Sequence, residues 1–128
     1  MSRYFPTRAE CGHHTVFSKV SIRTYAGEHL QLSLADIPSD AAVDWHSHSN
    51  EQMGIVISGR AVFRVGGEAL ELGPGDLFFI PGGVRHQVVP VGGPVQVLDV
   101  FWPVREEYRL ANVAGSYANE YLGDEGST

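Results

Sequence analysis

Two histidine-containing segments carry the side chains best suited to chemistry. His46 and His48 stand two residues apart, and Gln52 follows four residues later. His86 comes just after the turn-forming residues 81–83, Pro-Gly-Gly. Histidine pairs also occur on protein surfaces without a metal. The second segment, with its own histidine, is what favours a metal site over a surface pair. Imidazole nitrogens and an amide oxygen are ligands for a divalent transition metal, and together these four side chains predict a mononuclear metal site.

Strand geometry is compatible with that grouping. Residues i and i+2 of an extended strand point to the same face, so His46 and His48 should project together. Gln52 has the same parity as both histidines, whereas Glu51 has the opposite parity and should point away. His86 must then come from a neighbouring strand.

The sequence predicts that the segments which must position these residues are short strands. Leu30, Leu32 and Leu34 alternate with polar or small residues, which predicts a half-buried strand. Residues 66–67, Gly-Gly, separate two β-prone runs and predict a hairpin. Short strands divided by Gly/Pro turns are typical of a sandwich or barrel, and a two-sheet jelly-roll barrel fits their number. The predicted strands are 15–22, 22–25, 30–35, 52–57, 61–65, 68–72, 77–80, 86–91 and 95–102.

Length and composition predict one domain and exclude several functions. The 128 residues suffice for a single core. We expect an N-terminal arm (1–14), a barrel (15–103) and a partly loose C-terminal segment (104–128), with a short helical turn within 106–111. A net charge of −6 argues against nucleic acid and anionic membrane partners. A single cysteine excludes an intrachain disulfide, and no signal peptide or membrane-spanning run is evident, which predicts the cytoplasm.

An aspartate on the last predicted strand is a second candidate. Asp99 and Phe101 share parity with Val95 and Val97, so this face should be apolar and internal. Burying a carboxylate there is costly unless it is paired or functional. Asp99 is therefore either a general acid or base, or a structural partner of an arginine or a backbone group.

The histidine segments resemble the two sequence motifs of the cupins. The first cupin motif is G-x5-H-x-H-x3,4-E-x6-G, and this chain has His46-x-His48-x3-Gln52-x6-Gly59. The second is G-x5-P-x-G-x2-H-x3-N, and this chain has Gly75-x5-Pro81-x-Gly83-x2-His86. The chain departs from these motifs at Asp40, Gln52 and Pro90, where Gly, Glu and Asn are usual. The resemblance implies an all-β cupin fold (a double-stranded β-helix or jelly-roll barrel) that holds a metal through His46, His48, Gln52 and His86.

Glutamine in place of glutamate changes the charge of the predicted site. A carboxylate ligand would reduce the charge of a divalent site from +2 to +1, whereas the Gln52 amide leaves it at +2. Such a centre is a stronger Lewis acid, which favours enolisation, isomerisation or cyclisation over oxygen activation. The ligand set would accept Zn, Ni, Fe, Mn or Co.

A narrower resemblance suggests a substrate. H-S-H-x-x-E-Q-x-G from His46, with D-V-F-x-P-x-R-E-x-Y ending at Tyr108, resembles the small pectin-degradation cupins, which linearise 4,5-unsaturated monouronates in sugar metabolism. The resemblance implies proton transfer by Asp99, ring packing by Phe101 and carboxylate binding by Arg105, whose planar fork matches a carboxylate.

These features lead to three hypotheses. The first is an isomerase-like or tautomerase-like enzyme that moves a proton, without redox change, on a small, oxygen-rich and anionic molecule. The second places a metal-dependent dioxygenase or a polyketide cyclase on the same site. The third is a non-catalytic cupin that binds a ligand or a metal. We also expect a homodimer, because an N-terminal arm can add to the sheet edge of a partner.

Overall fold

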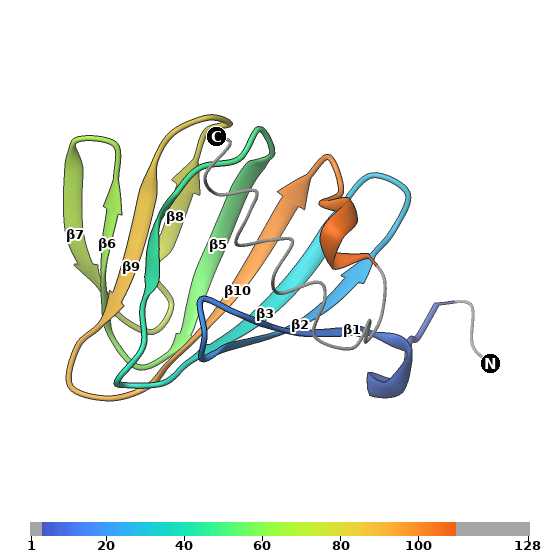
Figure 1. Ribbon diagram of the computed structural model, residues 1–128, viewed down its shortest axis with the longest axis horizontal. Helices are drawn as coiled ribbons and strands as arrows, with labels where there is room; N and C mark the ends of the chain where they lie inside the picture. The colour runs from blue at the N-terminus through green and yellow to red at the C-terminus, as the bar shows by residue number, and fades with distance from the viewer. Residues whose placement is uncertain (1–3, 110–128) are drawn as a thin grey trace.

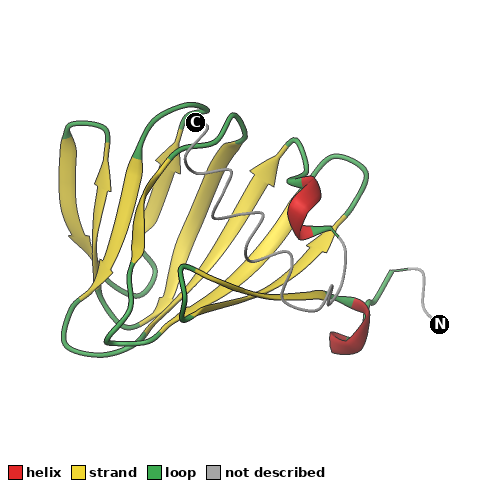
Figure 2. Ribbon diagram, in the orientation of Figure 1, coloured by secondary structure: helices red, strands yellow, loops and turns green. Residues whose placement is uncertain are grey.

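The computed structural model describes residues 4–109 as ten strands and two short 3-10 helices (Figures 1 and 2). The helices are η1 (Arg8–Glu10) and η2 (Glu106–Tyr108). The strands are β1 (Gly12–Val16), β2 (Val20–Ala26), β3 (Gln31–Ile37), β4 (Val43–His46), β5 (Glu51–Ser58), β6 (Ala61–Val65), β7 (Glu68–Leu72), β8 (Leu77–Ile80), β9 (His86–Pro90) and β10 (Val95–Trp102). Neither helix has the length or hydrophobicity of a membrane-spanning helix.

The strands form two antiparallel sheets that face each other. One sheet has the order β1-β2-β3-β10-β5-β8, and the other has the order β4-β9-β6-β7. Strands far apart in the chain therefore pair, so that β10 lies between β3 and β5 (Figure 1). This arrangement confirms the predicted all-β jelly-roll barrel. The Gly-Gly hairpin is also confirmed, because β6 and β7 pair across residues 66 and 67.

The core lies between the inner faces of the two sheets. On β10 the side chains of Val95, Val97, Asp99 and Phe101 alternate inward, as their shared parity predicted. The three apolar members, Val95, Val97 and Phe101, pack in one cluster with side chains of the opposite sheet, among them Phe63. A carboxylate thus lies on an otherwise apolar strand face.

The β3 strand alternates as predicted, but its buried face begins with two polar residues and its leucines lie on the other face. Gln31 and Ser33 are buried, whereas Leu32 is 48% exposed. Gln31 is tolerated inside because its amide pairs with both backbone groups of Arg105: the Arg105 N–H donates to Oε1 (2.8 Å), and Nε2 donates to the Arg105 carbonyl (3.2 Å). The leucines consequently cover the outside of the sheet.

The N-terminal part differs from the sequence prediction. β1 begins at Gly12, within the expected arm, and pairs with β2. The predicted run 15–22 is broken by a tight turn in which Phe17 and Ser18 have positive φ angles of 49° and 64°. Phe and Ser rarely adopt positive φ angles, which are usual for Gly and less so for Asn or Asp, so the residue types did not indicate this turn. The predicted helical turn is the 3-10 helix η2, and the expected loose tail lies outside the described residues after Arg109.

Gly54 provides a test of the packing between β5, β8 and β10. A Cβ atom there would lie 2.3 Å from Cζ of Phe78 and 2.5 Å from the Leu98 carbonyl oxygen. Because the carbonyl belongs to the sheet backbone and cannot move aside cheaply, Gly54→Ala should destabilise the fold by about 1–3 kcal/mol. Denaturant unfolding measures this. Gly67→Ala is the matched control, since nothing lies within 4 Å of its added Cβ; an equal effect of both substitutions would contradict the packing argument.

Candidate metal centre

Three buried histidines meet at one end of the space between the sheets. His46 ends β4 and pairs in register with His86, the first residue of β9. His48 follows in the loop before β5, and its ring centroid lies 5.6 Å from that of His46 and 5.0 Å from that of His86. One nitrogen of each ring can be chosen so that all three lie within 4.8 Å of one another. The three side chains that the sequence grouped are therefore positioned for a metal ion.

Backbone carbonyls orient the three rings in the same way. Each Nδ1 lies within hydrogen-bond distance of a carbonyl oxygen two residues away: His46 with Asp44 (2.8 Å), His48 with Asn50 (3.1 Å) and His86 with Val84 (2.8 Å). A carbonyl only accepts, so each Nδ1 carries the proton and each Nε2 keeps a lone pair. This is the arrangement expected of histidine ligands whose outer nitrogen is held by the protein.

The Gln52 side chain completes the group with an oxygen. Its Nε2 donates to Oδ1 of Asp99 (2.8 Å), which turns Oε1 toward His48 Nε2 at 3.0 Å. These two facing atoms are both acceptors when His48 is protonated on Nδ1. His86 Nε2 is buried and has no hydrogen-bond partner within residues 4–109. Acceptors that point at one another without a proton fit a cation, so this donor set suits a divalent metal.

Electrostatics keep the imidazoles in the ligand form. Burial lowers the pKa of His46 to about 2 and that of His48 to about 3. Burial also lowers the pKa of His86, and the positive charge of Arg105 acts in the same direction. All three rings are therefore neutral at pH 7, as metal binding requires.

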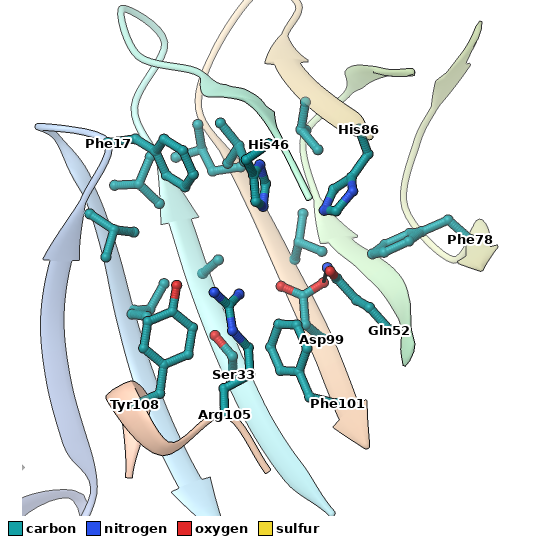
Figure 3. A pocket seen from close by; sticks show the side chains of 18 of the residues that line it. Phe17, Ser33, His46, Gln52, Phe78, His86, Asp99, Phe101, Arg105 and Tyr108 are labelled. Carbon is teal, nitrogen blue, oxygen red and sulfur yellow. Dashed lines mark hydrogen bonds between the residues drawn. The ribbon is translucent and has the colours of Figure 1, made fainter. Parts of the chain in front are cut away.

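Asp99 and Arg105 lie beside the histidines and line the same cavity (Figure 3). Burial raises the pKa of Asp99 to about 7, opposed by its hydrogen bond from Gln52 and by the charge of Arg105. Arg105 is 4% exposed, and its Nε and Nη2 donate to Oε2 of Glu107 at 3.1 and 2.9 Å. Its guanidinium carbon lies 5.2 Å from the Phe101 ring centroid and 4.5 Å from that of Tyr108. The fold thus brings every predicted site residue into one region.

Sequence reasoning missed several residues of this region. Ser33 lines the cavity and lies opposite Asp99 in the register of β3 and β10. Ser33 has the same parity as Gln31, and that was the available signal that both point inward. The leucines that alternate with them obscured this signal. Tyr108 also lines the cavity, whereas Glu107 acts as the partner of Arg105. Nothing in the spacing of the chain predicted that partnership.

The fold and the histidine cluster define a small jelly-roll barrel with three histidines positioned for a metal ion between its sheets. The family described as "Cupin domain" matches residues 33–101, more than half of the chain. The protein therefore belongs to the cupin family, as its two motifs predicted.

Three individual proteins are also similar. An uncharacterised protein of Streptomyces coelicolor is 34% identical over 56 residues, which cover 44% of this chain and only 53% of that protein. The structure of KdgF from Halomonas sp. has a TM-score of 0.69 at 26% identity, covering 74% of this chain and 90% of its own. An RmlC-like cupin from Shewanella frigidimarina has a TM-score of 0.74 at 23% identity, covering 84% and 96% respectively, which supports the fold.

Metal analysis tests the histidine cluster. Purified wild-type protein should hold about one divalent metal ion per chain, and His86→Ala should lose most of it because one of the three facing nitrogens is removed. Inductively coupled plasma mass spectrometry measures the content. His29→Ala is the control, since the His29 side chain is 78% exposed. Undiminished metal in His86→Ala would refute the site.

Proposed function

We propose that the protein is a metal-dependent cupin enzyme that catalyses redox-neutral proton transfer on a small, oxygen-rich acid. His46, His48, Gln52 and His86 are the proposed ligands. A divalent ion held there would supply Lewis-acid polarisation of a substrate oxygen. The proposal leaves the metal open among Zn, Ni, Fe, Mn and Co, which all suit imidazole and amide donors.

One observation carries the proposal: a buried carboxylate lies beside the histidines and faces the same cavity. Asp99 is joined to the site through the Gln52 amide, which donates to its Oδ1, and it lines the cavity. A carboxylate in that position is within reach of a molecule bound at the centre and can take or give a proton there. We assign Asp99 the proton transfer.

Arg105 and Phe101 are the proposed binding groups. The Arg105 guanidinium is buried against the cavity, and its planar fork has the geometry to bind a substrate carboxylate. Phe101 lies on the same face of β10 as Asp99 and offers an apolar ring for packing. An anionic substrate follows from this pairing.

The substrate class that we propose is an unsaturated monouronate. Support comes from the resemblance of the 46–54 and 99–108 segments to the pectin-degradation cupins and from the similarity to KdgF at 26% identity. The conversion is an isomerisation. A proton leaves the anomeric hydroxyl, the bond from the anomeric carbon to the ring oxygen breaks, and the enolate released takes a proton on carbon and becomes a ketone. Asp99 can serve both transfers, so no redox partner is required. A cytoplasmic role in sugar breakdown is part of this proposal.

The size of the cavity indicates how a substrate must enter. The cavity has a volume of about 50 Å³ and is partly open, which leaves room for an ion and a few waters but not for a whole sugar ring. Arg105 and Tyr108 line it and lie in or next to the short helix η2 (Figure 3). We therefore expect substrate binding to displace the segment that carries these two residues.

Asp99→Asn tests the proton-transfer role. The amide cannot accept a proton, so turnover of an unsaturated monouronate should fall by at least about 100-fold, whereas the metal content should remain. A coupled assay of the open-chain product measures turnover, and mass spectrometry measures the metal.

The matched control is Asp36→Asn, which changes an exposed carboxylate on the outer face of β3. It should keep full turnover. Full activity in Asp99→Asn with metal bound would reject the role of Asp99. Substrate-dependent oxygen consumption by the Fe(II)-loaded protein would instead favour the dioxygenase hypothesis.

A further inference from the structure

The arginine proposed to bind the substrate already holds a carboxylate of its own chain. Arg105 is 4% exposed, and its side chain points into the cavity between Tyr108 and Asp99 (Figure 3). Its Nε and Nη2 both donate to one oxygen of Glu107, Oε2, at 3.1 and 2.9 Å. A substrate carboxylate that takes these two donors must therefore replace Glu107.

The contact with Glu107 uses the guanidinium less fully than a substrate could. Nε and Nη2 form one edge of the planar fork, yet both donate to a single oxygen of Glu107. A carboxylate placed squarely against that edge would accept one hydrogen bond on each of its oxygens, which is the stronger and more directional arrangement. A ligand that is not tied to the chain can align in this way, whereas Glu107 is attached only two residues from Arg105.

The two partners of this ion pair are anchored differently. The fully buried Gln31 side chain binds both backbone groups of Arg105, so the arginine is fixed at its base. The Glu107 side chain is 20% exposed and can turn toward solvent by rotating its own torsions. Glu107 is therefore the partner that can leave, and its rotation is the first movement in the displacement of this segment by a substrate.

We propose that Glu107 is a specificity-determining residue, whose carboxylate holds Arg105 and is displaced only by a ligand that brings a carboxylate of its own. The proposal rests on the proposed role of Arg105 in binding an acid. A buried guanidinium without a counter-charge is strongly unfavourable. Exchanging one carboxylate for another keeps the charge paired, whereas a neutral sugar offers no replacement. Glu107 thus selects against neutral ligands, and it also weakens the binding of acids because only molecules with Arg105 released can bind them.

Calorimetric titration of the full chain with galacturonate, a saturated uronate, tests the competition. Glu107→Gln keeps an oxygen that can accept from Arg105 but removes the competing charge. This variant should bind galacturonate about 10-fold more tightly than the wild-type protein. Galactose has no carboxylate to exchange, so the same substitution should give it no gain in affinity. A purely structural defect would not favour the acid over the neutral sugar.

Glu106→Gln is the matched control. It removes the same charge from the neighbouring residue, whose ion pair with Arg109 is at the surface, with side chains 73% and 42% exposed. This variant should bind galacturonate as the wild-type protein does, because an exposed pair contributes little. Equal tightening in both variants would overturn the proposal, since the loss of one negative charge from the chain would then explain the effect.

Nuclear magnetic resonance of the zinc-loaded wild-type protein provides a test that needs no variant. The Arg105 Nε–H is buried and donates to Glu107, so its resonance reports on the oxygen that it faces. Galacturonate should shift this resonance as the carboxylate of Glu107 is exchanged for that of the ligand, and galactose should leave it in place. This result decides the matter if Glu107→Gln folds poorly.

Three further results would contradict the role of Glu107. The first is a folded Glu107→Gln variant that binds galacturonate no more tightly than the wild-type protein. The second is an equal gain for galactose, and the third is an Arg105 resonance that galacturonate does not move. Failure of the proposed function alone has a different signature: an unsaturated monouronate would not be turned over, although Glu107→Gln would still gain affinity for galacturonate.

Discussion

The orientation of one amide organises the candidate site. The Gln52 side chain has a donor end and an acceptor end, and Asp99 binds the donor end at 2.8 Å. The acceptor end consequently faces the histidines, where a cation ligand is needed. A glutamate at position 52 would place a second carboxylate against Asp99, and two buried like charges at that distance are strongly unfavourable. The departure of Gln52 from the usual cupin glutamate and the presence of Asp99 on β10 are therefore parts of the same arrangement, although they lie 47 residues apart.

The same two strands serve the inside and the outside of the barrel. On β10, Asp99 and Phe101 face the cavity while Leu98 and Val100 face outward, and β5 alternates Gln52 inward with Met53 outward. Because side chains alternate along a strand, the outward-facing side chains of β5 and β10 do not reach the site between the sheets. The distance between Gln52 and Asp99 depends on the backbone of these two strands, which pair with each other.

Local patterns predicted much of this structure, and long-range partnerships limited the rest. The hairpin at Gly66-Gly67 and the inward face of β10 were predictable because they depend on near neighbours in the chain. The clustering of the three histidines was predictable because the spacing within each motif fixes the direction of its side chains. Which face of β3 is buried was not predictable, since Gln31 is stabilised inside by the backbone of Arg105, 74 residues away. The pairing of Arg105 with Glu107 was not predicted either, because two neighbouring charges of opposite sign do not reveal which of them is buried.

The charges around the cavity suggest why metal and acidic substrate should bind together. Arg105 can bind a carboxylate by direct contact, but its charge is balanced by Glu107 and Asp99 can add only negative charge, so these described side chains give the cavity no net positive charge. The chain as a whole carries −6, which repels an acid at longer range. With an amide as the proposed fourth ligand, the full +2 charge of a divalent ion would remain to offset this repulsion. In the proposed site the neutral ligand set would have two consequences, a stronger Lewis acid for the chemistry and a positive centre for the substrate, and both would follow from the single exchange of a carboxylate for an amide at position 52.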